Sequence, residues 1–400
     1  MLTNKNQSRR GIALLFVMGA LMIITVISIE LTQRSQIAKQ SVLGRRDAVK
    51  ALELAKAAFR WSTFRLQLDT QLDGIPVIPG TNFGGKKDDF SEMQWNFPLT
   101  YPFPVSLTAN QIDDLETEQV ASAESLEGSF VTSIKDASAK INLNDVGIGG
   151  PPGQKVVSGA AKVLLYLLSS PRFQKYYQYD SNQKINEIVY SIDDWTDVDT
   201  QINHLGGGDE DQEYAIKDFP YTVKNGPFFT LSEVGMLKTL NDELFEELKP
   251  FVTVYPFDAK IPRVSSQPVV PKGKINVNTA PVELIAALIS PRAMTSNRDR
   301  LTCAQKFAQA RALQAFRSIK AGGTEPSFMT FMQDFCGAQN QDNTSSDNDF
   351  IEKQVMAILD VRSDLFEIEA VGISGNIEKT ISAVVLRSKD GVKTLYWKVL

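Results

Sequence analysis

The chain has 400 residues, of which 43% are hydrophobic and 22% are charged, and its formal net charge is −5. This composition is ordinary for a globular protein, and the length allows two or three domains. A net acidic chain with a pI of about 5.3 does not suit a nucleic-acid binder, because such proteins gain much of their affinity from Lys and Arg on phosphates.

The N-terminal part contains an uncharged apolar run from Ile12 to Ile29. It has 18 residues, close to the roughly 20 that a helix needs to cross the hydrocarbon core of a bilayer. The run is preceded by three bases and no acid: Lys5, Arg9 and Arg10. This asymmetry predicts one transmembrane helix over residues 12–30, with the N-terminus in the cytoplasm and the rest of the chain across the membrane.

Two kinds of processing signal compete for this run. A secretory signal peptide has a shorter apolar core and a small-residue cleavage site after it, and no Ala-x-Ala pattern follows Ile29. The alternative is a cut before the apolar core, between Gly11 and Ile12, which removes the basic leader 1–11 and keeps the helix. A basic leader, a Gly and an apolar helix resemble the class III signal of type IV pilins and pseudopilins. Most such subunits carry Glu at the fifth residue after the cut, where this chain has Phe16.

Residues 31–68 are predicted to continue the same helix, because they contain no Pro and a single Gly, Gly44. Ala48, Leu52, Ala55 and Phe59 recur at spacings of four, three and four, which places them on one helical face. We expect this face to pack against a folded domain, so that one helix lies half in lipid and half on that domain.

Two regions of alternating, β-branched sequence predict an antiparallel sheet. Residues 128–144 predict a hairpin or two strands that turn near residues 136–138. The C-terminal part predicts a meander, with a turn at Lys389-Asp390-Gly391 before its last strand. The two regions need each other, because three strands with one covered face are about the minimum for independent stability. We therefore expect an α+β fold in which the long helix packs on an antiparallel sheet and a large helical insertion separates the strands.

The sequence divides into six segments in this interpretation. They are a cleaved leader (1–11), a transmembrane helix (12–30), the first part of the sheet domain (31–143), a helical insertion (144–250), a strand with a second helical segment (251–362) and the C-terminal strands (363–400).

Two further features concern chemistry. Cys303 and Cys336 are the only cysteines, and a disulfide and two buried free thiols are both consistent with their spacing. No nucleophile motif or P-loop occurs, and the single histidine, His204, lies in a Gly-rich stretch, so we do not expect an enzyme.

Several stretches in order resemble the protein K family of type II secretion, the large minor pseudopilins. They are residues 10–15, 140–144, 194–199, 208–214, 224–233 and 274–281. The absence of Glu at Phe16 agrees with this family, which differs from other pseudopilins at that position. The resemblance implies a pilin-like domain with a SAM-like helical insertion, and prepilin-peptidase cleavage at Gly11 with methylation of Ile12.

The resemblance also implies a place and partners. It predicts an inner-membrane protein with a periplasmic domain, at the tip of the pseudopilus that exports folded proteins across the outer membrane. Its expected partners are the minor pseudopilins I and J, the major pseudopilin, the prepilin peptidase and the inner-membrane secretion platform.

An acidic cluster at residues 193–211 is a candidate calcium site. Calcium takes six to eight oxygen ligands, and Asp197, Asp199, Glu210 and Asp211 with neighbouring Gly-rich backbone offer them. The alternative is a solvated acidic loop. The resemblance favours calcium, and Trp195 is expected to be a core anchor beneath this loop.

A rival function is DNA uptake. Residues 274–288 resemble a helix-hairpin-helix, a motif that contacts DNA phosphates in other proteins. The acidic charge and the lack of a Gly-x-Gly hairpin with following bases speak against it, so no nucleic-acid partner is expected.

Overall fold

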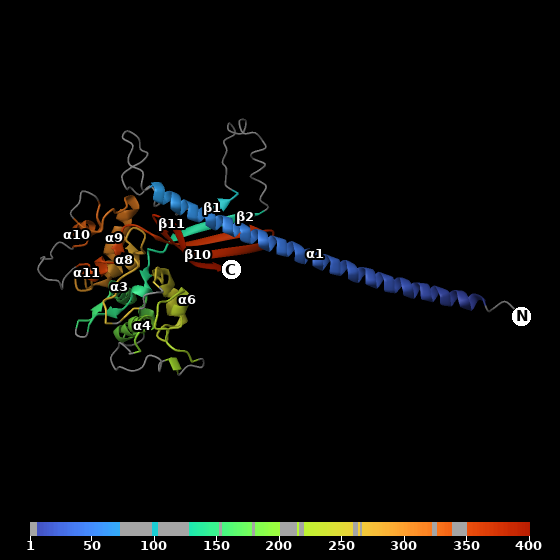
Figure 1. Cartoon of the computed structure of the whole chain (residues 1–400), viewed down its shortest axis with the longest axis horizontal. Helices are drawn as coiled ribbons and strands as arrows, with labels where there is room; N and C mark the ends of the chain where they lie inside the picture. Colours follow the sequence, from blue (N-terminus) through green and yellow to red (C-terminus); the bar gives the residue numbers. More distant parts are fainter. Residues whose placement is uncertain are drawn as a thin grey trace, which may run out of the picture.

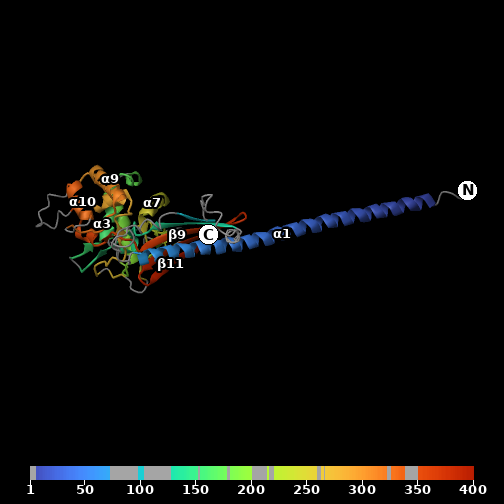
Figure 2. The ribbon, with the colours of Figure 1, turned by 90° about the horizontal axis from the view of Figure 1, so that it is seen from above.

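The N-terminal part of the chain is one long helix, α1 (Asn6–Leu72), which confirms the predicted continuation past the apolar run. At 1.5 Å per residue such a helix is about 100 Å long. Its first half projects away from the rest of the molecule, and its second half lies along the folded part (Figures 1 and 2). The computed structural model describes residues 6–72, 98–102, 128–151, 154–177, 181–200, 214–215, 220–258, 263–264, 266–321, 326–337 and 350–400.

A five-stranded sheet lies against the second half of α1. Its strands, in spatial order, are β1 (Leu99–Tyr101), β2 (Ser129–Asp136), β9 (Leu365–Ser374), β10 (Ile377–Ser388) and β11 (Gly391–Val399). All neighbours are antiparallel. The C-terminal meander is as predicted, and β10 and β11 pair up to Ser388 and Gly391 at the predicted turn. The strand β2 pairs with β9, with Ser129 opposite Ile373, although residues 137–364 separate them in sequence.

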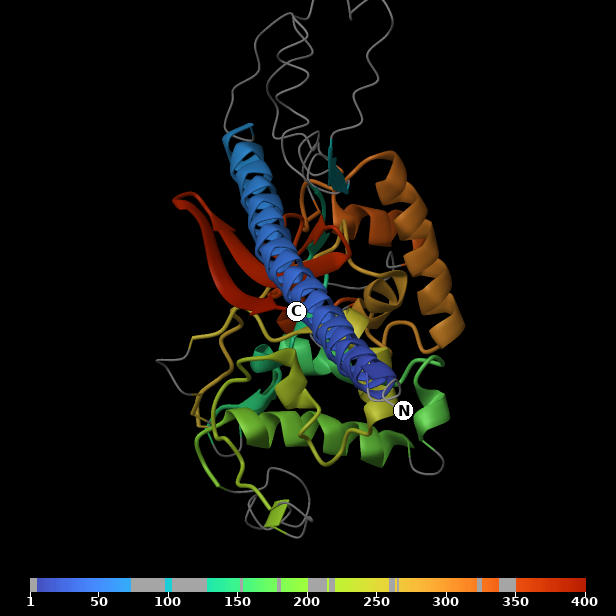
Figure 3. The same cartoon turned by 90° about the vertical axis from the view of Figure 1, so that its right-hand side faces the viewer.

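Contact between α1 and the sheet is close enough to involve backbone on both sides (Figure 3). A Cβ at Gly372 of β9 would lie 2.1 Å from the carbonyl oxygen of Ala51 and 2.4 Å from the amide nitrogen of Ala55. Near the end of the helix, Asp69 and Arg387 of β10 form a buried ion pair. Small residues and one ion pair therefore hold the helix on the sheet.

The buried face of α1 is not centred on the predicted face of Ala48, Leu52, Ala55 and Phe59. Leu52 and Phe59 are only partly buried at the edge of the contact, and Phe59 packs edge-on against Trp397 with ring centroids 4.7 Å apart. Most of the buried residues at the centre of the face are small or polar, and only two are large and apolar: Ala51, Leu54, Ala55, Ala58, Ser62, Leu66 and Asp69. Small residues lie there because the helix backbone approaches the strand backbone closely.

Residues 137–364 form a helical insertion with its own hydrophobic core, separate from the core between α1 and the sheet. Its helices are α3 (Gly159–Leu168), α4 (Ser181–Thr196), α6 (Leu231–Val234), α7 (Asp242–Leu248), α8 (Val282–Leu288), α9 (Asn297–Leu313), α10 (Phe328–Phe335) and α11 (Lys353–Met356). Its 3₁₀ turns, within the part of the chain that the structure describes, are η2 (Leu143–Asp145), η3 (Gln174–Tyr176) and η4 (Lys249–Phe251). Thr230 and Glu233 form a capping box at the start of α6.

Short strands organise the insertion into two similar halves. In the first, β3 (Ile141–Asn142) pairs in parallel with β6 (Val252–Thr253). In the second, β7 (Ile275–Asn276) pairs in parallel with β8 (Leu359–Asp360). A small hairpin of β4 (Ile148–Gly149) and β5 (Val156–Val157) follows β3. The predicted strands of residues 128–144 thus exist but do not pair with each other, because β2 belongs to the main sheet and β3 to the insertion.

The repeated Lys-Ile-Asn-x-Asn sequence explains this duplication. Asn144 accepts a hydrogen bond from the amide of Phe228 (2.8 Å) and donates to the carbonyls of Phe228 (3.0 Å) and Val254 (2.7 Å). The second copy makes the same three bonds from Asn278, with the amide of Phe316 (2.9 Å) and the carbonyls of Phe316 (2.9 Å) and Val361 (3.0 Å). Each asparagine therefore ties the start of its half to an aromatic segment and to the returning strand.

The contact at Gly372 generates a test of the helix–sheet packing. Gly372→Ala should lower the free energy of unfolding of the chain from residue 35 onward by roughly 1–3 kcal/mol, because the added methyl group meets helix backbone that must shift. Urea denaturation measures this. The matched control is Gly226→Ala, whose new Cβ would lie 3.8 Å from the carbonyl oxygen of Lys224, an ordinary contact distance. Equal stability of the two variants would show that the helix does not pack as described.

Candidate functional site

The first half of α1 presents apolar side chains to its surroundings. Within the described residues, α1 is the one helix long and apolar enough to cross a membrane. Leu14 is 61% exposed and Phe16 is 76% exposed. The hydroxyl of Thr25 donates to backbone carbonyls one turn earlier, Leu21 at 3.0 Å and Met22 at 2.8 Å, so it needs no partner from outside the helix.

The polar boundary of this segment is an ion pair. Glu30 and Arg34, the first charged residues after the apolar run, lie one turn apart and pair at 2.5 Å. Phe16 lies four residues, about one helical turn, after Ile12. Gly11 and Ile12 belong to α1, and their side chains lie outside the described set.

The acidic cluster begins at the end of α4, where the chain enters the core. Trp195 is 3% exposed and stacks on Phe228 with ring centroids 5.9 Å apart, which confirms it as a core anchor. Asp193 and Asp197 are fully buried on either side of it in sequence. Asp199, on the segment after the helix, is half-buried, and its carbonyl accepts a hydrogen bond from Asn225 at 3.0 Å.

Arg263 also belongs to this cluster, although the sequence pattern did not point to it. It pairs with the carboxylate of Asp193, and one of its nitrogens lies 3.7 Å from Asp197. It also donates to the carbonyl of Asp193 (2.6 Å) and to the hydroxyl of Thr196 (3.1 Å). Sixty-odd residues separate it from the aspartates, and no local pattern marks it.

The guanidinium of Arg263 lies close to more than one carboxyl group. Burial, together with the charges of Asp193, Asp199 and Asp194, raises the pKa of Asp197 to about 8 against the opposing effect of Arg263. Burial likewise raises the pKa of Asp193. A raised pKa favours the neutral form of a buried carboxyl, and a cation bound beside it would favour the ionised form.

The described residues alone do not complete a metal site. Of the four predicted ligands, Asp197 and Asp199 are described, whereas Glu210 and Asp211 lie outside the described residues, as does His204. No group of three or more His, Cys, Asp or Glu side chains suited to a metal occurs in the part of the chain that is described. A calcium site here therefore depends on oxygens from residues 201–213.

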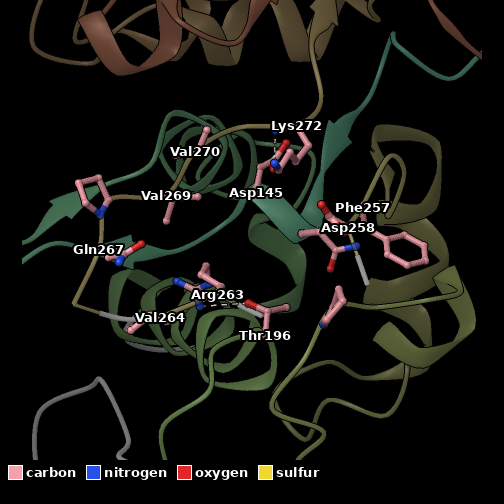
Figure 4. A pocket seen from close by; sticks show the side chains of 13 residues that line it. Asp145, Thr196, Phe257, Asp258, Arg263, Val264, Gln267, Val269, Val270 and Lys272 are labelled. Carbon is pink, nitrogen blue, oxygen red and sulfur yellow. Dashed lines mark hydrogen bonds between the residues drawn. The ribbon is translucent and has the colours of Figure 1, made fainter. Parts of the chain in front are cut away.

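A pocket of about 230 Å³ opens beside the acidic cluster (Figure 4). Arg263 and Thr196 lie on one side of it, and Asp145 and Lys272 lie on another. Asp145 is fixed by the amides of Lys272 (2.9 Å) and Gly273 (2.6 Å). The pocket shares Arg263 with the acidic cluster, so any ion held by the cluster borders it.

The two cysteines lie together in the second half of the insertion. A disulfide joins Cys303 of α9 to Cys336 at the end of α10, with their Cα atoms 5.5 Å apart. It links two helices that also meet through ring contacts of Phe307 in α9 with Phe328 and Phe331 in α10.

Three comparisons with known proteins bear on this chain. The family model for protein K of the type II secretion system matches residues 139–257, the first half of the insertion. Type II secretion system protein K of Klebsiella pneumoniae is 24% identical over 324 residues, covering 80% of this chain and 81% of that protein. The protein of the same name from Pseudomonas aeruginosa is 25% identical over 282 residues, covering 70% and 68%.

A solved structure shares the fold. The GspK–GspI–GspJ complex from the type 2 secretion system of enterotoxigenic Escherichia coli contains a chain that aligns with a TM-score of 0.51 and 18% identity. The alignment covers 92% of this chain and 99% of that chain. The long helix, the antiparallel sheet and the helical insertion therefore occur together in a known protein.

Proposed function

We propose that the chain is a minor pseudopilin of the protein K family of the type II secretion system, and that it initiates and caps the pseudopilus tip. In this role it is a structural subunit rather than an enzyme. The observation that carries the proposal is the combination of an exposed apolar helix with a bulky insertion on a pilin-like sheet. The relatives that share sequence with it over about two thirds or more of the chain carry the name of protein K of type II secretion, which supports secretion over DNA uptake.

Phe16 supports a place at the tip. A Glu in lipid is costly unless it is paired, and pilin-type subunits are expected to pair it with a neighbouring N-terminal amine. Phe16 carries no charge and is 76% exposed on α1, so it requires no such neighbour. The insertion lies at the end of the molecule opposite the N-terminus, where it widens the subunit beyond the sheet (Figure 1). A subunit of this shape suits the first position of a fibre and would obstruct stacking above it.

We propose that the apolar half of α1 anchors the chain in the inner membrane, with the sheet and insertion in the periplasm. The proposed cut by prepilin peptidase falls between Gly11 and Ile12, and Ile12 then becomes the methylated N-terminus. The basic residues before the apolar run support this orientation.

Processing can be measured directly. Mass spectrometry of the membrane-extracted chain should give a protein that begins at Ile12 and carries one added methyl group. Gly11→Val should keep the leader, because the peptidase needs the small residue at the cut, whereas the control Gly19→Val should be processed normally. An N-terminus beyond Glu30 would mean that the anchor is removed, and the proposed assembly would then be wrong.

The proposed partners in the tip are the minor pseudopilins I and J, and then the major pseudopilin and the inner-membrane platform. The Escherichia coli structure supports the first two, because its protein K chain is described there in a complex with GspI and GspJ. The likeness in fold over 92% of this chain is the basis for carrying that arrangement across as a proposal.

Co-purification tests this proposal. The full-length chain, tagged at its C-terminus and extracted in detergent, should retain pseudopilins I and J expressed from the same bacterium. A tagged single-pass protein of unrelated family serves as the control for non-specific retention. Loss of both partners at low detergent would contradict the tip assignment. A gel shift of a short DNA duplex at low salt by the same preparation would instead favour the DNA-uptake alternative.

We also propose that calcium binds the acidic cluster, with Asp197 and Asp199 as ligands and Glu210 and Asp211 completing the set. The closeness of Asp193, Asp194 and Asp199 to Asp197 supports a cation there, because it brings several carboxyl groups to one place. When bound, calcium would supply positive charge to buried carboxylates and fix the segment after α4 against the core that holds Trp195.

Chelation should therefore destabilise the protein. A ligand at about 100 times its Kd stabilises the folded state by about 2.7 kcal/mol, so EDTA should lower the melting temperature by several degrees. Asp197→Ala should erase the difference between calcium and EDTA. Asp390→Ala, in the exposed turn between β10 and β11, should leave that difference unchanged. The absence of any calcium-dependent shift in the unmodified chain would refute the site.

A further inference from the structure

The second half of the insertion contains a pocket that the secretion role does not explain. Its volume is about 590 Å³, and it opens between the C-terminal end of α3 and the helices α7, α8 and α9. The helices α3, α8 and α9 pack together, α8 against both of the others (Figure 1). Apolar side chains line much of it, among them Val282, Ala286 and Leu301. It lies in a different part of the insertion from the acidic cluster and shares no lining residue with the pocket there.

Arg300 of α9 lines this pocket and is only 5% exposed. One terminal nitrogen, Nη2, donates to the side-chain oxygen of Asn297. The other, Nη1, is buried without a hydrogen-bond partner, and no described carboxylate forms an ion pair with this guanidinium. Burial also lowers the pKa of Arg300, which is the effect expected of a cation that has lost water without gaining an acid.

The acids that line the pocket, and Glu352, which binds the pocket residue Tyr166, are engaged with other bases. Arg172, which also lines the pocket, forms ion pairs with Glu247 at 2.6 Å and with Glu283 at 3.0 Å. Glu352 binds Lys162 and accepts a hydrogen bond from the hydroxyl of Tyr166 at 2.5 Å. Arg300 is therefore left as an unbalanced positive charge in a net acidic chain, and an unpaired buried charge is costly to keep.

A second buried group in the pocket also lacks a partner. The hydroxyl oxygen of Ser170, after the end of α3, is buried and makes no hydrogen bond to the residues that the structure places. Arg300, Ser170 and the apolar residues thus line one space. Guanidinium groups bind carboxylates through directed, charge-assisted hydrogen bonds.

From this arrangement we infer that the pocket binds a peptide carboxylate, with Arg300 holding the acid and the wall formed by Val282, Ala286 and Leu301 taking the adjacent apolar side chain. The ligand is a segment of another protein that presents an acid beside an aliphatic residue. This inference does not rest on the tip assignment, because it follows from the unpaired guanidinium and the pocket alone.

Binding is measured on the full-length chain in detergent by fluorescence anisotropy with labelled peptides. The first pair of probes is acetyl-Ala-Leu-Ala-Leu with a free C-terminal carboxylate and the same peptide with a C-terminal amide. The second pair has both ends blocked and differs only by Glu or Gln beside an internal Leu. Saturable binding of either acid, with a loss of roughly tenfold or more for its neutral counterpart, is the expected result. The pair that shows the difference tells whether the pocket takes a chain end or a side-chain acid.

Three variants separate the role of Arg300 from a general effect on folding. Arg300→Met keeps the length of the side chain and removes the charge, so it should lose binding of the acid by roughly tenfold or more without lowering the melting temperature. Arg298→Met removes an exposed arginine from the same helix and should bind as the unmodified chain does. Ala286→Leu fills the pocket from α8 and should abolish binding while Arg300 remains.

Several results would overturn the inference. Equal binding of acid and neutral peptides would show that the pocket does not recognise a carboxylate. Unchanged binding by Arg300→Met would show that Arg300 does not hold the acid. If Arg300→Met does not fold, Ala286→Leu and the two peptide pairs still decide the matter on the unmodified residue. No saturable binding of either acid in the micromolar to millimolar range would overturn it outright. Competition by inorganic phosphate as effective as that by the free-acid peptide would mean a general anion site.

Discussion

The close approach of α1 to the sheet is the constraint on which the rest of the structure depends. The backbone of β9 reaches the helix because Gly372 has no side chain, and the residues of α1 opposite it are Ala51 and Ala55. The Asp69–Arg387 pair fixes the end of the helix to β10, and Arg387 also donates to the carbonyl of Ser363 at 2.6 Å. Because α1 also carries the apolar segment, this contact sets how the folded domain is placed relative to that segment.

The same contact explains how so large an insertion is tolerated. The strands β2 and β9 pair side by side, so the chain leaves the sheet after Asp136 and returns at Leu365 at neighbouring points. The insertion closes on itself through two parallel strand pairs and the asparagines Asn144 and Asn278. It therefore has a core of its own, and its loops can carry binding residues without disturbing the helix–sheet contact.

Two arginines in the insertion stand in different electrostatic situations. Arg263 lies among several buried aspartates and pairs with Asp193. Arg300 lies in a largely apolar pocket whose acids are already paired, so its surroundings are short of negative charge. A peptide carboxylate would restore the local balance at Arg300. Neither situation follows from net charge, because both depend on which residues the fold brings together.

The sequence alone determined the features that depend on local pattern: the continuous helix from the apolar run, the terminal strands with their turn, and the buried Trp195. It also carried the repeated Lys-Ile-Asn-x-Asn segments, although only the structure shows that each repeat begins one half of the insertion. Tertiary structure decided the pairing of β2 with β9, the helix face centred on Ala51 and Ala55, and the partners of Asp197 and Arg300. These contacts join residues far apart in the chain, and their energies come from close packing and from charge in a shared buried space, which no local pattern of residues encodes.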